Sequence, residues 1–406
     1  MKRLRNPVVG LVGCAAVGRG ALLVLVVVCT RTHSRDQFDA LVYALAVGTG
    51  VQILLDPNTA AMLVVRWKRG VADYSEWLCG LRLQVLAALG VALLTGGIVG
   101  AGVGTRQGVA LGLSLGAMFG AESLARYARC VWQTEARLGR YAVVDLLVGL
   151  GRVAVAAALI GSRGLGRFEV AAVVVAAAWA VAVLVGVARR VGWSAIAGNS
   201  PVRKMLREVW PYGLSTALSA AYAQAPAILI GLVGGLRAAA VYGIAARMTQ
   251  TSELLPASLS AVFLPRLAAS TGDSQQAVFR RQLRAALATG GLCCVAFVLA
   301  APVALPLLGV PWHEGSGVVL LLALALVPKF LSYQYVSLAL AQGRVKARLG
   351  ASGAIAVLSV GGVLVLAGVG AVPVAAMTLA CELGLLGLLY WMTHDRAPAP
   401  VRSAIA

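Results

Sequence analysis

Charged side chains are scarce in this chain. Asp, Glu, Lys and Arg make up 12% of the 406 residues, whereas hydrophobic residues make up 60%. Soluble domains carry about 25% charged residues, and the mean hydropathy of +0.86 is too high for a surface that faces water. These values exclude a soluble enzyme, a secreted globular protein and a disordered chain. Because helices satisfy every backbone polar group inside lipid, the sequence predicts an all-α, polytopic membrane protein.

The residue types that build metal centres and catalytic sites are also few. The chain has 3 histidines, and its 7 cysteines form no Cys-x-x-Cys pair. No P-loop or His-Glu-x-x-His motif occurs. A zinc site needs several such ligands at close spacing. We therefore expect no catalytic residues, no metal site and no cofactor, and we do not expect an enzyme.

Acidic residues are the scarcer charged class. The chain has 15 Asp and Glu against 35 Lys and Arg, which gives a net charge of +20. In a soluble protein this excess would suggest nucleic acid, but no basic run is long or interleaved with aromatic residues. Basic loops that orient membrane helices explain the excess better. We expect membrane lipids as partners, and no nucleic acid.

Long apolar runs are abundant. A spanning helix needs about 20 mainly apolar residues. Twelve runs meet this length, at 7–30, 38–65, 78–102, 108–129, 141–162, 167–189, 212–234, 236–266, 282–309, 316–342, 348–369 and 371–393. The second, eighth and ninth contain Pro57, Pro256 and Pro302 with Pro306, so we expect kinked or tilted helices there.

Basic residues alternate between the loops. The N-terminus, the C-terminus and the loops 66–77, 126–140, 189–211, 266–284 and 344–348 carry most of the Lys and Arg. The bias over the other loops is roughly four to one, which predicts that both termini lie in the cytoplasm of a cell-membrane protein.

The chain is predicted to contain two halves. The longest connection, 191–211, includes an amphipathic segment, Pro201–Trp210, that resembles a short helix on the membrane surface. A shift of 199 positions aligns Tyr43 with Tyr242 and Pro57 with Pro256. We therefore predict two pseudo-symmetric six-helix bundles, at 1–190 and 212–406, joined by this linker. Parallel repeats of this kind place a substrate site at their interface.

Charged residues inside the predicted helices are the main functional signal, because each costs roughly 2.5–3.5 kcal/mol to insert. The cationic candidates for a substrate-binding cavity are Arg19, Arg152, Arg247 and Lys329. The acidic candidates, for ion coupling or for pairing, are Asp56, Glu122, Asp145, Glu253 and Glu382.

Two interpretations of these charges stay open. In one, the charges pair between helices and only stabilise the bundle. In the other, they line a hydrated cavity for an anionic head group, since the guanidinium of Arg suits pyrophosphate through bidentate donation. Arg19 and Arg247 are the first candidates, because they lie deep and have no acidic residue within one turn.

One stretch carries a recognisable pattern. Residues 211–270 contain Ile228-Leu229-Ile230-Gly231, the run 240–247 ending in Arg247, Leu255-Pro256, and Phe263-Leu264-Pro265-Arg266. With the run 35–43, this pattern resembles polysaccharide-export flippases of the Wzx type, in the MOP superfamily that includes MATE exporters and lipid II flippases. The resemblance implies a V-shaped bundle of six plus six helices that works by alternating access.

The resemblance also implies a function. Such flippases move an undecaprenyl-pyrophosphate-linked oligosaccharide across the cytoplasmic membrane for cell-surface polysaccharide biosynthesis, and basic residues on the first and eighth helices face their central cavity. Arg19 and Arg247 occupy those helices here. Polysaccharide polymerases and glycosyltransferases are the implied protein partners. The alternatives are a MATE-like exporter of cationic compounds and a polymerase or ligase, although the large outer loop of those enzymes is missing.

Overall fold

The described part of the chain is entirely helical. The computed structural model describes residues 24–57, 74–134, 138–160, 164–191, 202–253 and 272–394, except residue 343, and a few single positions between 59 and 270. Eight helices in these residues are long and apolar enough to cross a membrane. Large apolar side chains such as Leu93, Leu299 and Val365 are 69%, 74% and 78% exposed, as expected of surfaces that face lipid. The chain is therefore a multi-pass helical membrane protein, as predicted.

The helices follow the predicted spans closely. They are α2 (Arg35–Leu55), α4 (Tyr74–Val103), α5 (Arg106–Thr134), α6 (Leu138–Ala157), α7 (Gly166–Val191), α9 (Val202–Leu229), α10 (Leu236–Gln250), α12 (Gly272–Leu307), α13 (Trp312–Ala341), α14 (Val345–Leu366) and α15 (Ala371–His394). A π-helical turn, η2 (Ile230–Gly234), extends α9, and a 3-10 turn, η3 (Thr251–Glu253), follows α10. Of the predicted first span, 7–30, only the end is described, within a helix at 24–32.

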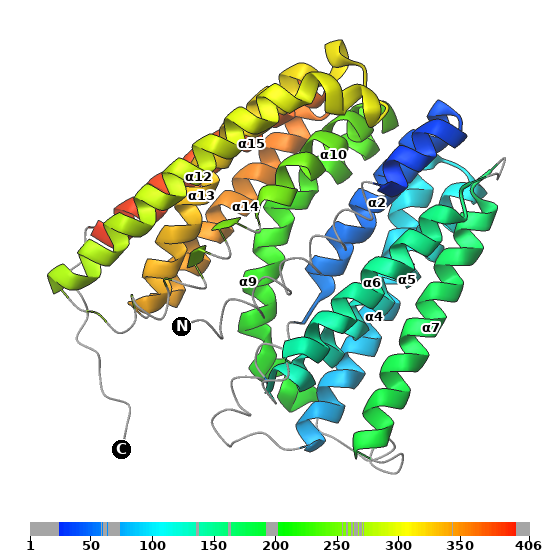
Figure 1. Cartoon of the computed structure of the whole chain (residues 1–406), viewed down its shortest axis with the longest axis horizontal. Coiled ribbons are helices and arrows are strands. Elements are labelled where there is room, and N and C mark those ends of the chain that lie inside the picture. The colour runs from blue at the N-terminus through cyan, green and yellow to red at the C-terminus, as the bar shows by residue number, and fades with distance from the viewer. Residues whose placement is uncertain are drawn as a thin grey trace. The chain divides into compact units, whose positions relative to one another are not determined.

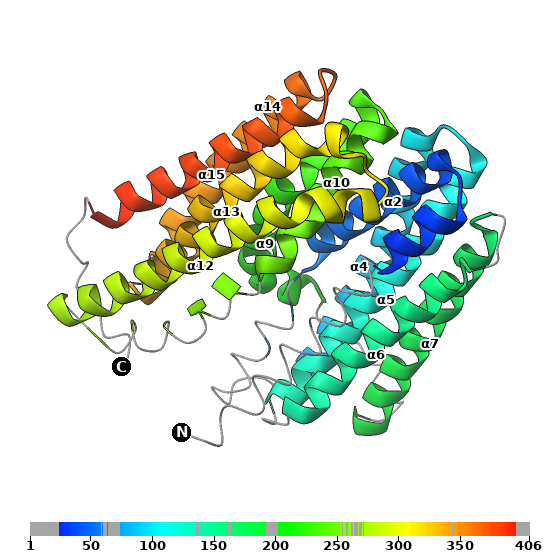
Figure 2. The same cartoon turned by 45° about the horizontal axis from the view of Figure 1, so that its top comes forward.

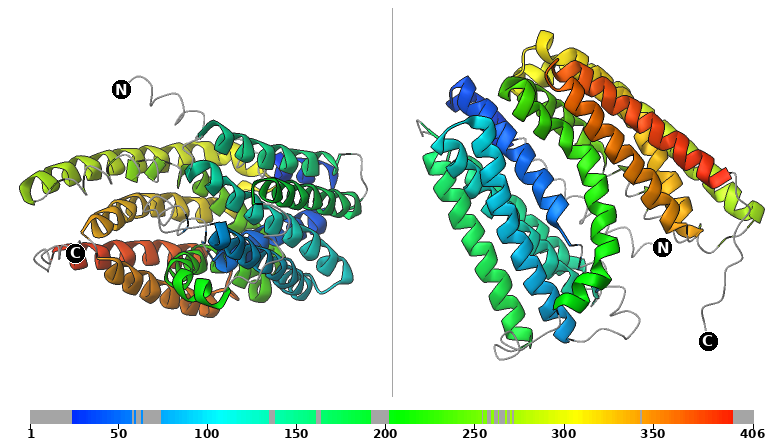
Figure 3. Two further views of the ribbon diagram at one scale, coloured as in Figure 1. Left: turned by 90° about the horizontal axis from the view of Figure 1, so that it is seen from below. Right: turned by 180° about the vertical axis from the view of Figure 1, so that it is seen from behind.

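The chain divides into two compact units. The first comprises Met1–Gly243 with Leu307–Gly309, and the second comprises Ile244–Pro306 with Val310–Ala406. In the first unit, α5 packs against α4, α6 and α7 (Figure 1). There α2 packs against α4, α5 and α9, and Figure 3 shows the blue α2 beside α4 from behind. In the second unit, α13, α14 and α15 pack on one another with α12 alongside (Figure 2).

The position of α9 bears on the division of the chain. Packing groups this helix with the first unit, whereas the sequence analysis assigns it to the second half, 212–406. Grouping by packing does not test a division by internal repeat, so the halves 1–190 and 212–406 stay a prediction. The amphipathic segment predicted in the linker forms the start of α9, which runs unbroken from Val202 to Leu229. Met205 is buried in a cluster with Trp77 and Tyr127, whereas Leu206 is exposed.

Two helices end earlier than the hydropathy of the sequence suggests. The span predicted over 38–65 ends as α2 at Leu55, and Asp56 is extended, with φ −66° and ψ 110°. The ring of a proline disfavours the helical conformation in the residue before it, so the helix is interrupted at Asp56 and Pro57, and the described residues Thr59 and Leu63 beyond them are helical again. The helix of the span 236–266 likewise ends at Gln250 and gives way to the 3-10 turn. By contrast, Pro302, Pro306 and Pro328 lie inside helices.

Both units contain the same type of buried hydrogen bond. In the first, Gln84 on α4 donates to Ser123 on α5 over 2.6 Å. In the second, Gln282 on α12 donates to Gln334 on α13 over 2.5 Å. The two donors are 198 positions apart in the sequence, close to the shift that aligns Tyr43 with Tyr242. In each predicted half, a hydrogen bond donated by a glutamine side chain thus joins the third and fourth spans.

Candidate functional site

The first unit contains a buried cluster of charges centred on Glu122. This residue lies on α5, and its side chain is 4% exposed. Its two carboxylate oxygens accept hydrogen bonds from Arg126, one turn later on the same helix, and from Arg152 on α6. Both N–O distances are 2.5 Å. Because a buried carboxylate is costly unless it is paired, this arrangement explains how Glu122 is tolerated inside a membrane span.

The same cluster reaches α2. Arg126 Nη2 donates to Gln52 Oε1 over 3.2 Å, and Gln52 Nε2 donates to the carbonyl oxygen of Phe119 over 2.6 Å. We call Gln52, Glu122, Arg126 and Arg152 the arginine cluster. It joins α2, α5 and α6 and carries one excess positive charge. The side chain of Arg126 is 36% exposed, so part of this positive charge is accessible from outside the bundle.

The second unit contains a cluster of opposite sign. Lys329 Nζ on α13 lies 2.7 Å from Glu253 Oε1 in η3 and 3.7 Å from Glu382 Oε1 on α15. We call these three residues the lysine cluster. It carries one excess negative charge. Glu382 is 2% exposed, and its Oε2 atom is buried with no hydrogen-bond partner among the described residues. A negative, incompletely satisfied cluster suits a cation or a proton better than an anion.

The remaining predicted residues are placed as follows. Arg19 lies outside the described residues. Arg247 is partly buried in the last turn of α10, one turn before η3. Asp56 is the C-cap of α2. Asp145 lies on α6, but its side chain is outside the described part of the structure.

The structure therefore pairs several predicted residues across helices. Arg152 and Lys329, two of the cationic candidates for a cavity lining, each form an ion pair with an acidic candidate. The pairing interpretation thus describes the local geometry of Glu122, Glu253 and Glu382. It does not exclude a role in binding, since the side chain of Arg126 is partly exposed.

Two functional candidates were missed by the sequence analysis. Arg126 was assigned to a cytoplasmic loop, although its spacing of four residues from Glu122 on one helix is a signal for pairing. The second is the pair of Arg237, on α10, with Asp39, on α2, at 3.2 Å. Asp39 is buried. No local signal predicts this pair, because its members are 198 positions apart.

The acidic and sulfur side chains do not gather into a metal centre in the described part of the chain. No group of three or more His, Cys, Asp or Glu residues there is placed to hold a metal ion.

Comparison with known proteins gives structural matches only. No model of a known protein family matches the chain, and no curated protein matches its sequence. Among solved structures, the lipid II flippase MurJ in an inward closed conformation matches with a TM-score of 0.73 and 12% identity, over 93% of this chain and 86% of that one. An outward-facing multidrug resistance MATE family transporter of the MOP superfamily matches with a TM-score of 0.62 and 14% identity, over 95% and 94%.

A further match has a distinctive site. It is a MOP superfamily transporter from Pyrococcus furiosus whose binding pocket is described as having reverse polarity, with a TM-score of 0.57 and 13% identity, over 95% and 94% of the two chains. At these identities the likeness concerns the fold and not the substrate. It extends over nearly all of each protein compared. The chain therefore has the fold of the MATE and MurJ transporters of the MOP superfamily.

Proposed function

We propose that this protein is a membrane transporter that flips a lipid-linked oligosaccharide, carried on undecaprenyl pyrophosphate, across the cytoplasmic membrane by alternating access. The observation that carries the proposal is the arginine cluster. Arg126 and Arg152 share one carboxylate, so the cluster retains a positive charge inside a membrane protein. A pyrophosphate is the anion that planar, bidentate guanidinium groups bind best.

Further support comes from the fold, which includes a lipid II flippase among its known members. We assign the first contact with the pyrophosphate to Arg126, because its guanidinium is partly exposed while its helix is anchored by Glu122. Arg19 and Arg247 stay in the proposal as additional cationic contacts. In this scheme the protein delivers the lipid-linked oligosaccharide for cell-surface polysaccharide biosynthesis. Polymerases and glycosyltransferases are its proposed protein partners.

A leaflet-exchange assay tests the proposal. The purified protein is reconstituted in liposomes with undecaprenyl pyrophosphate that bears a dye-labelled short oligosaccharide, and dithionite is added to bleach dye in the outer leaflet. The wild type should expose the whole dye pool, whereas protein-free liposomes should expose about half. Arg126→Ala should abolish exchange and Arg126→Lys should restore it in part, because Lys lacks the planar fork. Arg167→Ala, at an exposed position on α7, is the control.

Exchange by Arg126→Ala at the wild-type rate would remove Arg126 from the site. A wild type that exchanges no labelled lipid at all would remove the proposed substrate.

One observation favours a second function, export of a cationic compound. The lysine cluster has a net negative charge and a buried carboxylate oxygen without a partner among the described residues. A drug cation would be attracted to such a cluster. Efflux of ethidium from cells that express the protein tests this second function. If the function is correct, the wild type exports ethidium and Glu382→Gln abolishes the efflux.

A further inference from the structure

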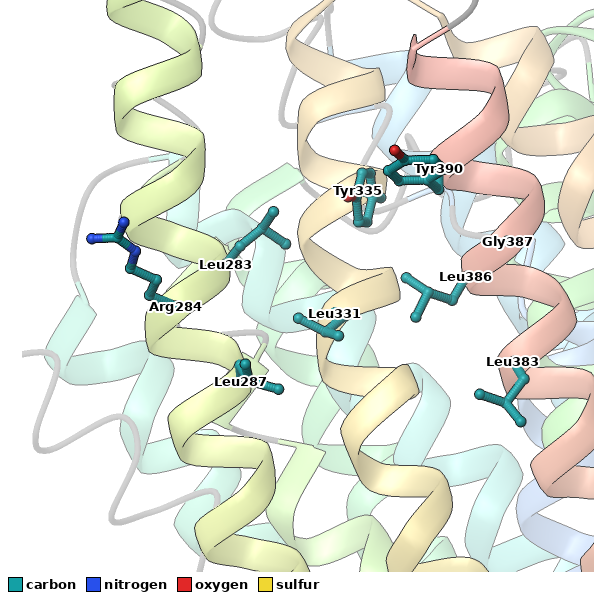
Figure 4. A pocket seen from close by; sticks show the side chains of 9 residues that line it. All are labelled: Leu283, Arg284, Leu287, Leu331, Tyr335, Leu383, Leu386, Gly387 and Tyr390. Atoms are coloured by element: carbon teal, nitrogen blue, oxygen red, sulfur yellow. The ribbon is translucent and has the colours of Figure 1, made fainter.

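The surface of the second unit contains a groove. It has a volume of about 500 Å³ and lies between α12, α13 and α15, in the size range of about 300–1,000 Å³ typical of ligand sites. Figure 4 shows its lining residues, which are Leu283, Arg284, Leu287, Leu331, Tyr335, Leu383, Leu386, Gly387 and Tyr390. None of them belongs to the arginine or lysine cluster.

The groove requires an apolar occupant. Leu287 and Leu383, on opposite walls, are 53% and 54% exposed. All three helices are long and apolar enough to span a membrane, and exposed leucines on such helices suit hydrocarbon better than water. An empty groove of this size would deprive its leucines of packing partners, and water would find few partners there. In a bilayer the occupant is therefore the chain of a lipid.

One end of the groove is polar. Tyr335 and Tyr390 lie there with ring centroids 6.0 Å apart, and Phe279 packs on Tyr335 at 5.1 Å. Arg284 lines the groove at its rim, and its exposed side chain extends from α12 away from the leucines (Figure 4). Arg280 and Arg281, one turn earlier on α12, are exposed as well. Tyrosines and arginines at one level are typical of the interface between lipid head groups and hydrocarbon.

The length of the groove limits how much of a lipid it holds. From Leu383 to Tyr390 it follows two turns of α15, about 10 Å at 1.5 Å per residue. This length accommodates a phosphate, the linkage below it and the first part of one chain. The rest of the lipid continues into the bilayer.

We infer that this groove is a binding site for an anionic glycerophospholipid, with the phosphate at Arg284 and one acyl chain along the leucines. Two features select this lipid. The basic residues at the rim complement an anionic head group. The two tyrosine hydroxyls lie at the level of the ester carbonyls of a glycerophospholipid, which accept hydrogen bonds. A polyprenyl phosphate has only hydrocarbon at that level. The site is independent of the proposed transport function.

Native mass spectrometry of the purified full-length protein tests the inference. The probes are phosphatidylglycerol, phosphatidylethanolamine and undecaprenyl phosphate, each titrated separately into delipidated protein. The wild type should bind one phosphatidylglycerol about tenfold more tightly than phosphatidylethanolamine, the effect of one charge-assisted contact. Arg284→Gln should remove this preference, whereas Arg167→Gln on α7 should keep it.

A second pair of variants tests the position of the site. A Cβ atom added at Gly387 meets no atom within 4 Å, so the backbone there accepts a side chain, and Gly387→Trp should fill part of the groove. Gly361 on α14 is equally exposed and unobstructed. We expect Gly387→Trp to weaken phosphatidylglycerol binding at least tenfold and Gly361→Trp to leave it unchanged. Equal binding by both variants would overturn the inference.

A measurement on the wild type alone tests the same site without depending on the folding of any variant. Phosphatidylglycerol with a photoreactive acyl chain is cross-linked in liposomes, and the labelled peptides are identified. Labels should appear on α12, α13 and α15 around the groove. Labels elsewhere, equal affinity for the two phospholipids, or tighter binding of undecaprenyl phosphate than of phosphatidylglycerol would each reject a glycerophospholipid site.

Discussion

Lys329 on α13 lies 2.7 Å from Glu253, although 76 positions separate the two residues in the sequence. The same ammonium group also faces Glu382 at 3.7 Å. One partly buried cation thus faces two carboxylates, so the loss of the lysine leaves two like charges close together. A loss of Glu253 leaves a balanced pair of Lys329 and Glu382.

This asymmetry gives the first prediction. Lys329→Met should destabilise the protein by about 3 kcal/mol, the cost of removing one partner of a buried pair. Glu253→Gln is the matched control and should cost clearly less. The apparent melting temperature in detergent, followed by tryptophan fluorescence, measures both. Equal melting temperatures for the two variants would contradict the conclusion that Lys329 compensates both Glu253 and Glu382.

The arginine cluster predicts an analogous effect. Glu122→Gln removes the carboxylate that Arg126 shares with Arg152, which is buried on α6. We expect a loss of about 3 kcal/mol. The double variant Glu122→Gln, Arg152→Met should recover part of this loss, since the buried guanidinium is then absent as well. Thermal melting of the single and double variants measures the coupling, and strictly additive losses would argue against the pair.

Close packing around Tyr43 gives a third prediction. Tyr43 on α2 is fully buried, and a Cβ atom added at Gly231 would lie 2.0 Å from its ring. Gly231→Ala should therefore cost about 2 kcal/mol through overpacking. Replacing the tyrosine by a smaller residue, in Gly231→Ala, Tyr43→Leu, should make the added methyl group harmless. Gly186→Ala on α7, where no atom lies within 4 Å, is the control and should melt like the wild type.

Much of the fold follows from the sequence, because long apolar runs leave a helix as the main solution inside lipid. The spans from 78–102 onward therefore correspond to described helices. At Pro57 the sequence analysis expected a kink within one span, whereas the backbone of Asp56 is extended and interrupts the helix there. The boundary depends on backbone sterics, which a hydropathy window does not see.

Less of the site could be predicted. The sequence identifies which charges are buried, because a charge within an apolar run is conspicuous. It does not reveal their partners, since Glu122 meets Arg152 across 30 positions and through the packing of α5 on α6. Only the contact of Glu122 with Arg126 is local enough to be read from spacing. The groove was also invisible, because its leucines look like any other lipid-facing residues.

The pair of Asp39 and Arg237 supports the last prediction. Arg237 Nη1 donates to Asp39 Oδ1 over 3.2 Å, so the pair joins the first turns of α2 and α10 within the first unit. Asp39 is 5% exposed, and its carboxylate depends on this guanidinium for compensation. Asp39→Arg should place two cations together and cost about 2 kcal/mol or more, the worth of a hydrogen bond between charged groups. Arg237→Asp should cost a similar amount by bringing two carboxylates together. The double reversal, Asp39→Arg with Arg237→Asp, rebuilds a pair of opposite charges at the same place and should restore part of the lost stability. Melting of the wild type, the two single variants and the double variant completes the thermodynamic cycle. If the double variant is no more stable than the weaker single variant, the two side chains do not interact in the folded protein.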